Sequence, residues 1–232
     1  HGIGVCNVRD YSTDSVVLVT VSLALSLVCH LPVYDRYCKS GAYTASGVHN
    51  LLEPVFYELS GKTWGLYGYG SIGKRGAQAA KAFGCEIAVC RRHPADGQTN
   101  LTLPELFETS DIISLHTPLN EQTLHSVNRD VLKHAAKKPI LINAARGAVV
   151  DEEAVACAVE SGLLSGFATD VYEGEPMRAD SPLRRLAGRD NVLFTPHMAW
   201  GAYEARKRLI EEVYRNIEAF LNGETRSRVD CL

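Results

Sequence analysis

Three side chains in the second half of the sequence could together bind a carboxylate and exchange a proton. Arg146 lies in the segment NAARG, Glu175 in DVYEGEP and His197 in TPHMAW. A planar guanidinium binds a carboxylate through two parallel hydrogen bonds, and an imidazole gains or loses a proton near neutral pH. A neighbouring carboxylate can orient that imidazole and favour its charged form. This set suits the reduction of a small keto acid if another group supplies a hydride.

Each of the three also has a structural alternative. Arg146 could cap a loop, Glu175 could be a surface acid beside Glu173, and His197 could be a core histidine with its hydrogen bonds satisfied. Their joint occurrence in these segments favours the chemical interpretation.

A glycine-rich turn, Gly68-Tyr69-Gly70-Ser71-Ile72-Gly73, follows a predicted strand at 63–67 and opens a predicted helix. Backbone N–H groups and the positive end of the helix dipole can bind a pyrophosphate at such a turn. The spacing alone is weak, because glycines are common at tight packing turns. In this strand-turn-helix setting we expect Gly68, Gly70 and Gly73 to bind a nicotinamide dinucleotide.

The strand that follows the glycine turn ends in two arginines, Arg91 and Arg92. Proteins that bind NAD usually carry an acidic residue there, about 20 residues past the turn, which accepts hydrogen bonds from the ribose hydroxyls. Two guanidinium groups would instead bind a 2′-phosphate, so the sequence favours NADP over NAD. The alternative is a pair of solvated arginines at the end of a strand.

Short apolar strands alternate with helical stretches from Lys62 onward, which predicts an α/β fold with a doubly wound parallel sheet. The predicted strands are 63–67, 86–90, 112–115, 139–143, 166–170 and 191–195, and the predicted helices are 72–83, 104–109, 129–135 and 152–161. Thr102 and Glu105 have capping-box spacing, and Gly162 suits a left-handed helix end.

The remaining segments flank this alternation. The apolar run Val16–Cys29 has 14 residues, whereas a membrane crossing needs roughly 20, so we expect a buried helix that ends before Pro32. The segment Gly2–Val5 resembles the middle of a strand. Leu31–Leu51 is predicted to be a loop or an arm that packs on a partner subunit. Apolar residues at helical spacing from Ala205 to Leu221 predict an amphipathic helix.

Composition excludes several classes of protein. The chain has 232 residues, 46% hydrophobic and 22% charged, with a net charge of -3, so its overall charge does not favour nucleic acid. The seven cysteines include no C-x-x-C pair, and we expect neither a disulfide framework nor a metal site. We therefore expect a protein of the reducing cytoplasm that binds neither nucleic acid nor membrane.

Over nearly its whole length the sequence resembles the D-isomer-specific 2-hydroxyacid dehydrogenase family, most closely its hydroxypyruvate reductase (glycerate dehydrogenase) and glyoxylate reductase branch. The matching segments are 2–7, 11–16, 68–73, 115–119, 142–151, 170–176 and 195–200.

The resemblance implies a Rossmann-like dinucleotide-binding lobe, a second substrate lobe, and a homodimer acting on a small 2-keto or 2-hydroxy acid. It implies that Arg146 binds the substrate carboxylate and polarises the keto oxygen, that His197 donates the proton, and that Glu175 holds the imidazole. The implied cofactor contacts are Ser71 and Ile72 at the pyrophosphate, Thr117 and Pro118 on the adenosine side, and Ala144 and Asp170 at the nicotinamide carboxamide. His116 falls on the cofactor side with no assigned role.

The resemblance also suggests a division of the chain. Residues 1–10 would be a remnant of the substrate lobe, 11–195 the dinucleotide-binding domain, and 196–232 a C-terminal helix returning to the substrate lobe. Family members carry a further N-terminal stretch that builds most of that lobe, so we expect this chain, taken by itself, to be much less active than a full-length member. Two alternatives stay open: a dinucleotide-sensing corepressor or scaffold of the same fold, and an inactive fragment.

Overall fold

The computed structural model describes residues 3–92 and 100–230. Six parallel strands form one sheet in the order β2-β1-β3-β4-β5-β6. Their bounds are β1 Thr63–Tyr67, β2 Glu86–Cys90, β3 Ile112–Leu115, β4 Ile140–Asn143, β5 Gly166–Thr169 and β6 Val192–Phe194. All six predicted strands are confirmed, with ends that differ by at most one residue.

The strand order determines where a ligand can bind. The chain passes from β1 to β2 on one side and then returns to place β3 on the other side of β1. The loops after β1 and β3 therefore leave the sheet in opposite directions, and a crevice opens at the carboxyl ends of these strands.

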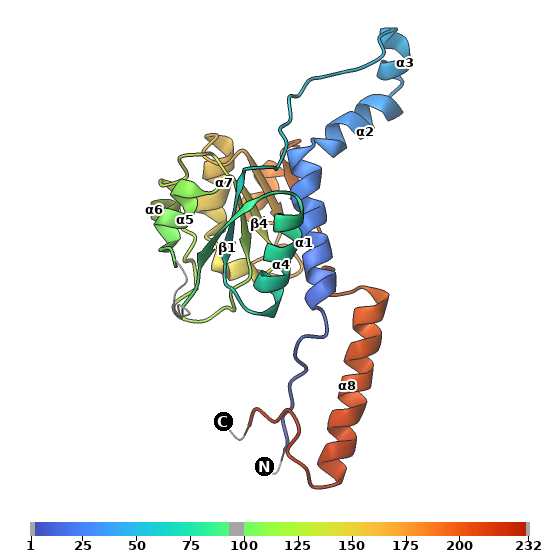
Figure 1. The fold of residues 1–232 in the computed structure, drawn as a ribbon, viewed down its shortest axis with the longest axis vertical. Helices are drawn as coiled ribbons and strands as arrows, with labels where there is room; N and C mark the ends of the chain where they lie inside the picture. The colour runs from blue at the N-terminus through green and yellow to red at the C-terminus, as the bar shows by residue number, and fades with distance from the viewer. Residues whose placement is uncertain (1–2, 93–99, 231–232) are drawn as a thin grey trace.

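Helices cover both faces of the sheet (Figure 1). On one face, α1 (Thr13–Val28) and α4 (Ser71–Ala82) pack on alternate strand residues such as Trp64 and Ile142. On the other face, α5 (Leu103–Thr109), α6 (Arg129–Leu132) and α7 (Glu152–Glu160) pack on residues such as Ile113 and Leu141. Full burial of such side chains contributes roughly 1.5–3 kcal/mol each, and it explains the continuous apolar runs of the strands.

Local signals set several helix ends. The capping box is confirmed, since the Thr102 side chain accepts from the Glu105 N–H while the Glu105 carboxylate accepts from the Thr102 N–H. Gly162 has a φ of +76°, as predicted for a left-handed end. Helix α6 stops at Leu132 instead of Ala135, because the Ala135 N–H bonds only three residues back, to the Leu132 carbonyl. Two short 3₁₀ helices, Gly147–Val149 and Pro182–Leu186, complete this part of the chain.

The segment after α1 corrects the prediction of a loop. It forms two helices, α2 (Leu31–Lys39) and α3 (Ala42–Ser46), which project away from the sheet (Figure 1). Neither helix buries a residue. Pro32 lies in the first turn of α2, where its missing N–H leaves no intrahelical bond unmade. The expected end of α1 before Pro32 is confirmed.

Within the described residues, no single helix is both long and apolar enough to cross a membrane. Among the described helices, one pair, α1 and α2 taken together, passes such a test, and the two are bent by 66°. In addition, α1 buries seven residues, so much of its apolar surface already packs within the protein.

The predicted C-terminal helix is confirmed as α8 (Tyr203–Leu221). It lies away from the sheet (Figure 1), and its C-terminal half contacts the first and last described segments of the chain. The Asn216 side chain donates to the Asn7 carbonyl at 3.2 Å, and the Val229 N–H donates to the Val5 carbonyl at 2.9 Å. The expected strand around Val5 does not form. A single antiparallel bridge joins Cys6 to Arg228, and Gly2 lies outside the described residues.

Candidate active site

The three residues singled out for chemistry follow three neighbouring strands. Arg146 comes shortly after β4, Glu175 after β5 and His197 after β6. Carboxyl ends of parallel strands meet at one edge of a sheet, so these loops converge there. Arg146 and His197 line a cavity of about 340 Å³ at this edge, and Glu175 contacts His197 from beside it.

The cavity is also lined by five of the eleven predicted cofactor contacts. It is lined by Ile72, Thr117, Pro118, Ala144, Arg146, Asp170 and His197 from the predicted set, together with Tyr11, Ser12, Val16, His116, Ala145, Ala199 and Trp200. Of this second group, only His116 was expected on the cofactor side; the other six residues were not predicted as contacts, because sequence patterns do not place their segments in space.

His197 and Glu175 form a close pair. His197 Nδ1 lies 2.6 Å from one carboxylate oxygen of Glu175, and the other oxygen accepts from the Tyr172 N–H at 3.0 Å. Desolvation raises the pKa of Glu175, but its hydrogen bonds to His197 and Tyr172 and the charge of Arg146 outweigh desolvation and lower the pKa overall. Glu175 is therefore ionised at neutral pH and can stabilise a positive charge on the imidazole.

The conformation of the loop that carries Arg146 is fixed by hydrogen bonds and by close packing. The buried side chain of Asn143 donates to the Arg146 carbonyl at 3.0 Å and accepts from the Ala145 N–H at 3.1 Å. A Cβ on Gly147 would lie 1.9 Å from the carbonyl carbon of Tyr172. Only glycine lets the arginine loop approach the loop of Glu175 this closely.

The glycine turn has the shape that a phosphate-binding turn needs. Gly68 has a φ of +100°, and a Cβ there would lie 2.6 Å from the His116 backbone. A Cβ on Gly73 would lie 2.3 Å from the Gly68 carbonyl oxygen. Gly70 is the N-cap of α4, and a Cβ there would meet nothing within 4 Å. Two glycines thus permit close backbone packing, while the third leaves open space at the helix N-terminus where a ligand can approach.

Arg91 and Arg92 lie at the end of β2 and do not line the 340 Å³ cavity. The Arg91 guanidinium carbon is 5.4 Å from the ring centroid of Tyr69 in the glycine turn. The Asn100 side chain accepts from the Arg91 N–H at 2.9 Å and donates to the Arg91 carbonyl at 3.0 Å. Arg91 is therefore held beside the glycine turn, whereas Arg92 is exposed.

His116 has an unusual environment for a cavity-lining histidine. Its Nε2 is 2.9 Å from Ser114 Oγ, which also accepts from Trp64 Nε1 at 2.9 Å. The Ser114 hydroxyl can donate to Nε2 or accept from it, depending on the tautomer of the imidazole. The other ring nitrogen, Nδ1, is buried and has no hydrogen-bond partner in the described part of the chain. Desolvation lowers the pKa of His116 to about 4, so the ring is neutral at physiological pH.

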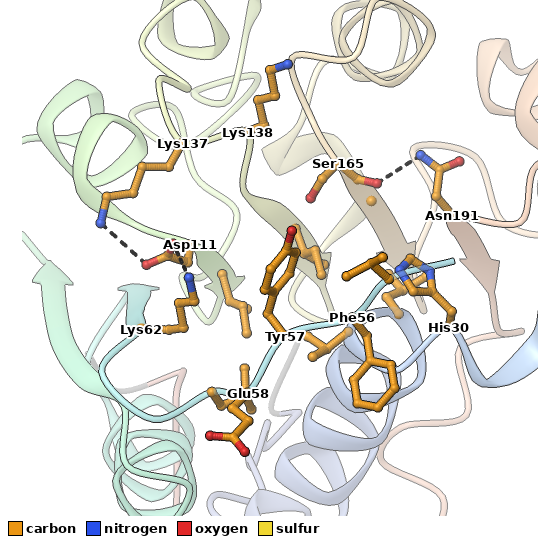
Figure 2. A pocket seen from close by; sticks show the side chains of 17 residues that line it. His30, Phe56, Tyr57, Glu58, Lys62, Asp111, Lys137, Lys138, Ser165 and Asn191 are labelled. Carbon is orange, nitrogen blue, oxygen red and sulfur yellow. Dashed lines mark hydrogen bonds and ion pairs between the residues drawn. The ribbon is translucent and has the colours of Figure 1, made fainter. Parts of the chain in front are cut away.

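A second cavity, of about 330 Å³, lies at the opposite edge of the sheet, where the strands begin (Figure 2). Its charged side includes Lys62 and Lys137, which share Asp111 at 4.0 Å and 3.4 Å. Figure 2 shows Tyr57 and His30 pointing toward the same hollow. None of the residues predicted for catalysis or cofactor binding lines it. The candidate active site is therefore the cavity at the carboxyl edge.

Comparisons with known proteins show which family the chain resembles. Residues 21–199 match a family model described as D-isomer specific 2-hydroxyacid dehydrogenase, NAD binding domain. The chain is 33% identical over 231 residues to a glycerate dehydrogenase of Methylorubrum extorquens, covering 100% of this chain and 73% of that protein. It is 34% identical over 230 residues to a glyoxylate reductase of Korarchaeum cryptofilum, covering 97% of this chain and 68% of that protein.

Solved structures show the same likeness. A D-lactate dehydrogenase from Aquifex aeolicus, complexed with NAD and lactic acid, aligns with a TM-score of 0.86 at 31% identity, over 96% of this chain and 71% of that chain. An acyclic imino acid reductase in complex with NADPH and D-Arg aligns with a TM-score of 0.86 at 29% identity, over 98% of this chain and 71% of that chain.

Proposed function

Because the chain belongs to the D-isomer-specific 2-hydroxyacid dehydrogenase family, we propose that its cleft reduces small 2-keto acids with a hydride from NAD(P)H. Hydroxypyruvate and glyoxylate are the favoured substrates, since the relatives include a glycerate dehydrogenase and a glyoxylate reductase. The observation that carries the proposal is the 2.6 Å contact between His197 and Glu175 beside the cavity that Arg146 lines.

The residues of the cleft fit a dinucleotide. The open space at Gly70 admits a pyrophosphate at the N-terminus of α4, and the orphaned Nδ1 of His116 offers a buried hydrogen-bonding atom. Ser71, Ile72, Thr117 and Pro118 would line the bound molecule, and Ala144 would offer its backbone carbonyl to the carboxamide. When bound, the reduced nicotinamide supplies the hydride to the keto carbon.

The protein's own groups would orient the substrate and supply the proton. Arg146 would bind the carboxylate through two hydrogen bonds and polarise the keto oxygen. With Nδ1 turned to Glu175, the opposite ring nitrogen of His197 is the one free to donate a proton to the developing alkoxide. Ionised Glu175 would keep the imidazole in the required orientation and favour its protonated form.

We propose that the cleft binds NADP(H) in preference to NAD(H). Arg91 is stacked beside the glycine turn at the end of β2, the position where an acid would face the ribose in a protein that prefers NAD. A guanidinium there can bind a 2′-phosphate, and Arg92 adds a second positive charge nearby.

A second copy of the chain is the proposed partner of the arm formed by residues 31–57. Helices α2 and α3 of the arm project from the body (Figure 1) and bury no residue, while residues 55–57 return to the cavity at the sheet edge. Its exposed apolar side chains are Leu31, Tyr43, Val48, Leu52, Val55, Phe56 and Tyr57. Such a surface is typical of one that another protein covers.

The test of the catalytic proposal compares two histidine variants. Oxidation of NADPH and NADH is followed with a panel of keto acids for the wild type, His197→Asn and His125→Asn. His125 is a matched control, because it is also left-handed, with a φ of 48°, and pairs with Glu173 at 3.1 Å, but lies outside the cavity. We expect His197→Asn to lose about 100-fold or more of the keto-acid-dependent rate, and His125→Asn to keep it. Equal rates for the wild type and His197→Asn would contradict the proposal.

A further inference from the structure

Asp170, the residue after β5, holds the loop of His197 through both its backbone and its side chain. Its carbonyl accepts from the His197 N–H at 2.8 Å. Its carboxylate accepts from the N–H groups of Met198 at 2.9 Å and Ala199 at 2.8 Å, and from Thr195 Oγ1 at 2.6 Å. Four donors of one loop therefore converge on a residue that is only 1% exposed.

This convergence accounts for the backbone conformation of His197. Its φ of +51° lies in the left-handed region, which is unfavourable for a residue with a Cβ. A left-handed residue can turn successive N–H groups toward one side, which creates a concave site for an anion. In this loop the anion is the carboxylate of Asp170.

We propose that Asp170 is a positioning residue for His197, which keeps the imidazole against Glu175 and at the cleft. Among the described residues, three donors occupy three of the roughly four acceptor positions of its carboxylate. The remaining acceptor position is on Oδ2, because Oδ1 already accepts from both Thr195 and Met198. Asp170 lines the cavity, so it can hold the loop and still accept one hydrogen bond from an amide of a bound molecule.

The far end of the loop has a separate anchor in α1. Ser15 Oγ donates to the Ala199 carbonyl at 2.6 Å and accepts from the Ala202 N–H at 3.2 Å. Ser15 is 5% exposed. Loss of the Asp170 carboxylate should therefore release the part of the loop that carries His197, while α1 still holds the rest.

The experiment uses the 232-residue chain without cofactor or substrate and compares the wild type with Asp170→Asn. The asparagine has nearly the same shape but presents an N–H₂ group where one acceptor oxygen stood, so at least one amide of the loop loses its partner. Hydrogen exchange of the Met198 and Ala199 amides, measured by NMR, should accelerate about tenfold. The imidazole N–H signal of the short His197–Glu175 bond should also be lost.

Two further variants keep the result specific. Thr195→Val removes one donor to the carboxylate but leaves both amides bonded, so exchange and the imidazole signal should stay as in the wild type. Asp170→Ser, whose shorter hydroxyl cannot reach both amides, should repeat the Asp170→Asn result and replaces it if that variant does not fold.

Unchanged exchange of Met198 and Ala199 in the Asp170 variants would overturn the proposal. So would an equal acceleration at Ile142 in β4, because it would mean general loosening. The kinetic consequence rests on the proposed function: Asp170→Asn should lower kcat for hydroxypyruvate and leave KM nearly unchanged, since Arg146 is intact. If the wild type neither binds NAD(P)H nor turns over keto acids, the proposed function fails, while the exchange measurements still decide the role of Asp170.

Discussion

The partly buried imidazole of His116 predicts a specific dependence of stability on pH. Desolvation lowers the pKa of His116 in the folded protein from 6.5 to about 4. Between these two values the unfolded chain binds a proton that the folded chain excludes, so the free energy of unfolding decreases as the pH falls through this window. The full effect is about 3 kcal/mol, of which about 2 kcal/mol accrues between about pH 7.5 and about pH 5.

Replacing His116 by Asn removes this contribution. We expect the wild type to lose about 2 kcal/mol more than His116→Asn between about pH 7.5 and about pH 5. Urea unfolding followed by the fluorescence of Trp64, which is 1% exposed, measures both free energies. His125→Asn, which removes a partly exposed histidine, controls for the loss of a histidine as such. The same pH dependence in the wild type and His116→Asn would refute the argument, because His116 would then be protonated as readily in the folded state as in the unfolded state.

Four further predictions address the loops, the cofactor and the partner. Gly147→Ala should destabilise the protein by about 2–3 kcal/mol, measured by urea unfolding, because its Cβ would overlap the Tyr172 backbone; an unchanged midpoint would contradict the close approach. Glu175→Gln should lower the keto-acid reduction rate about 10-fold to 100-fold at neutral pH. In the wild type the contribution of Glu175 should persist as the pH falls to below 4.5, because the pKa of Glu175 is lowered from that value. A Gln variant with the wild-type rate would exclude a role of Glu175 in holding the imidazole. Arg91→Asp should shift the ratio of NADPH to NADH dissociation constants toward NADH, measured by nicotinamide fluorescence, and a fixed ratio would remove the case for NADP. Leu52→Asp with Phe56→Asp should convert a dimer to a monomer in light scattering, whereas Leu124→Asp, an exposed apolar position outside the arm, should not; a monomeric wild type would contradict the proposed partner.

Much of the fold could be predicted because its signals are local. A strand of a parallel sheet is buried on both faces, so its apolar run marks it directly, as in β3 and β5. The capping box at Thr102 and the left-handed Gly162 act within a few residues of chain. The helices of the arm could not be predicted in the same way, because α2 and α3 bury no residue and their sequences therefore show no core-facing pattern.

The sequence by itself determined which groups are present: an arginine, a glutamate and a histidine placed after successive strands, and a glycine turn at the start of a helix. It could not show what surrounds each group. Only the tertiary structure decided that three donors of the His197 loop bind the carboxylate of Asp170 and that desolvation lowers the pKa of His116. The physical reason is that hydrogen-bond partners and desolvation come from residues distant along the chain, and the packing of strands and helices brings those residues together.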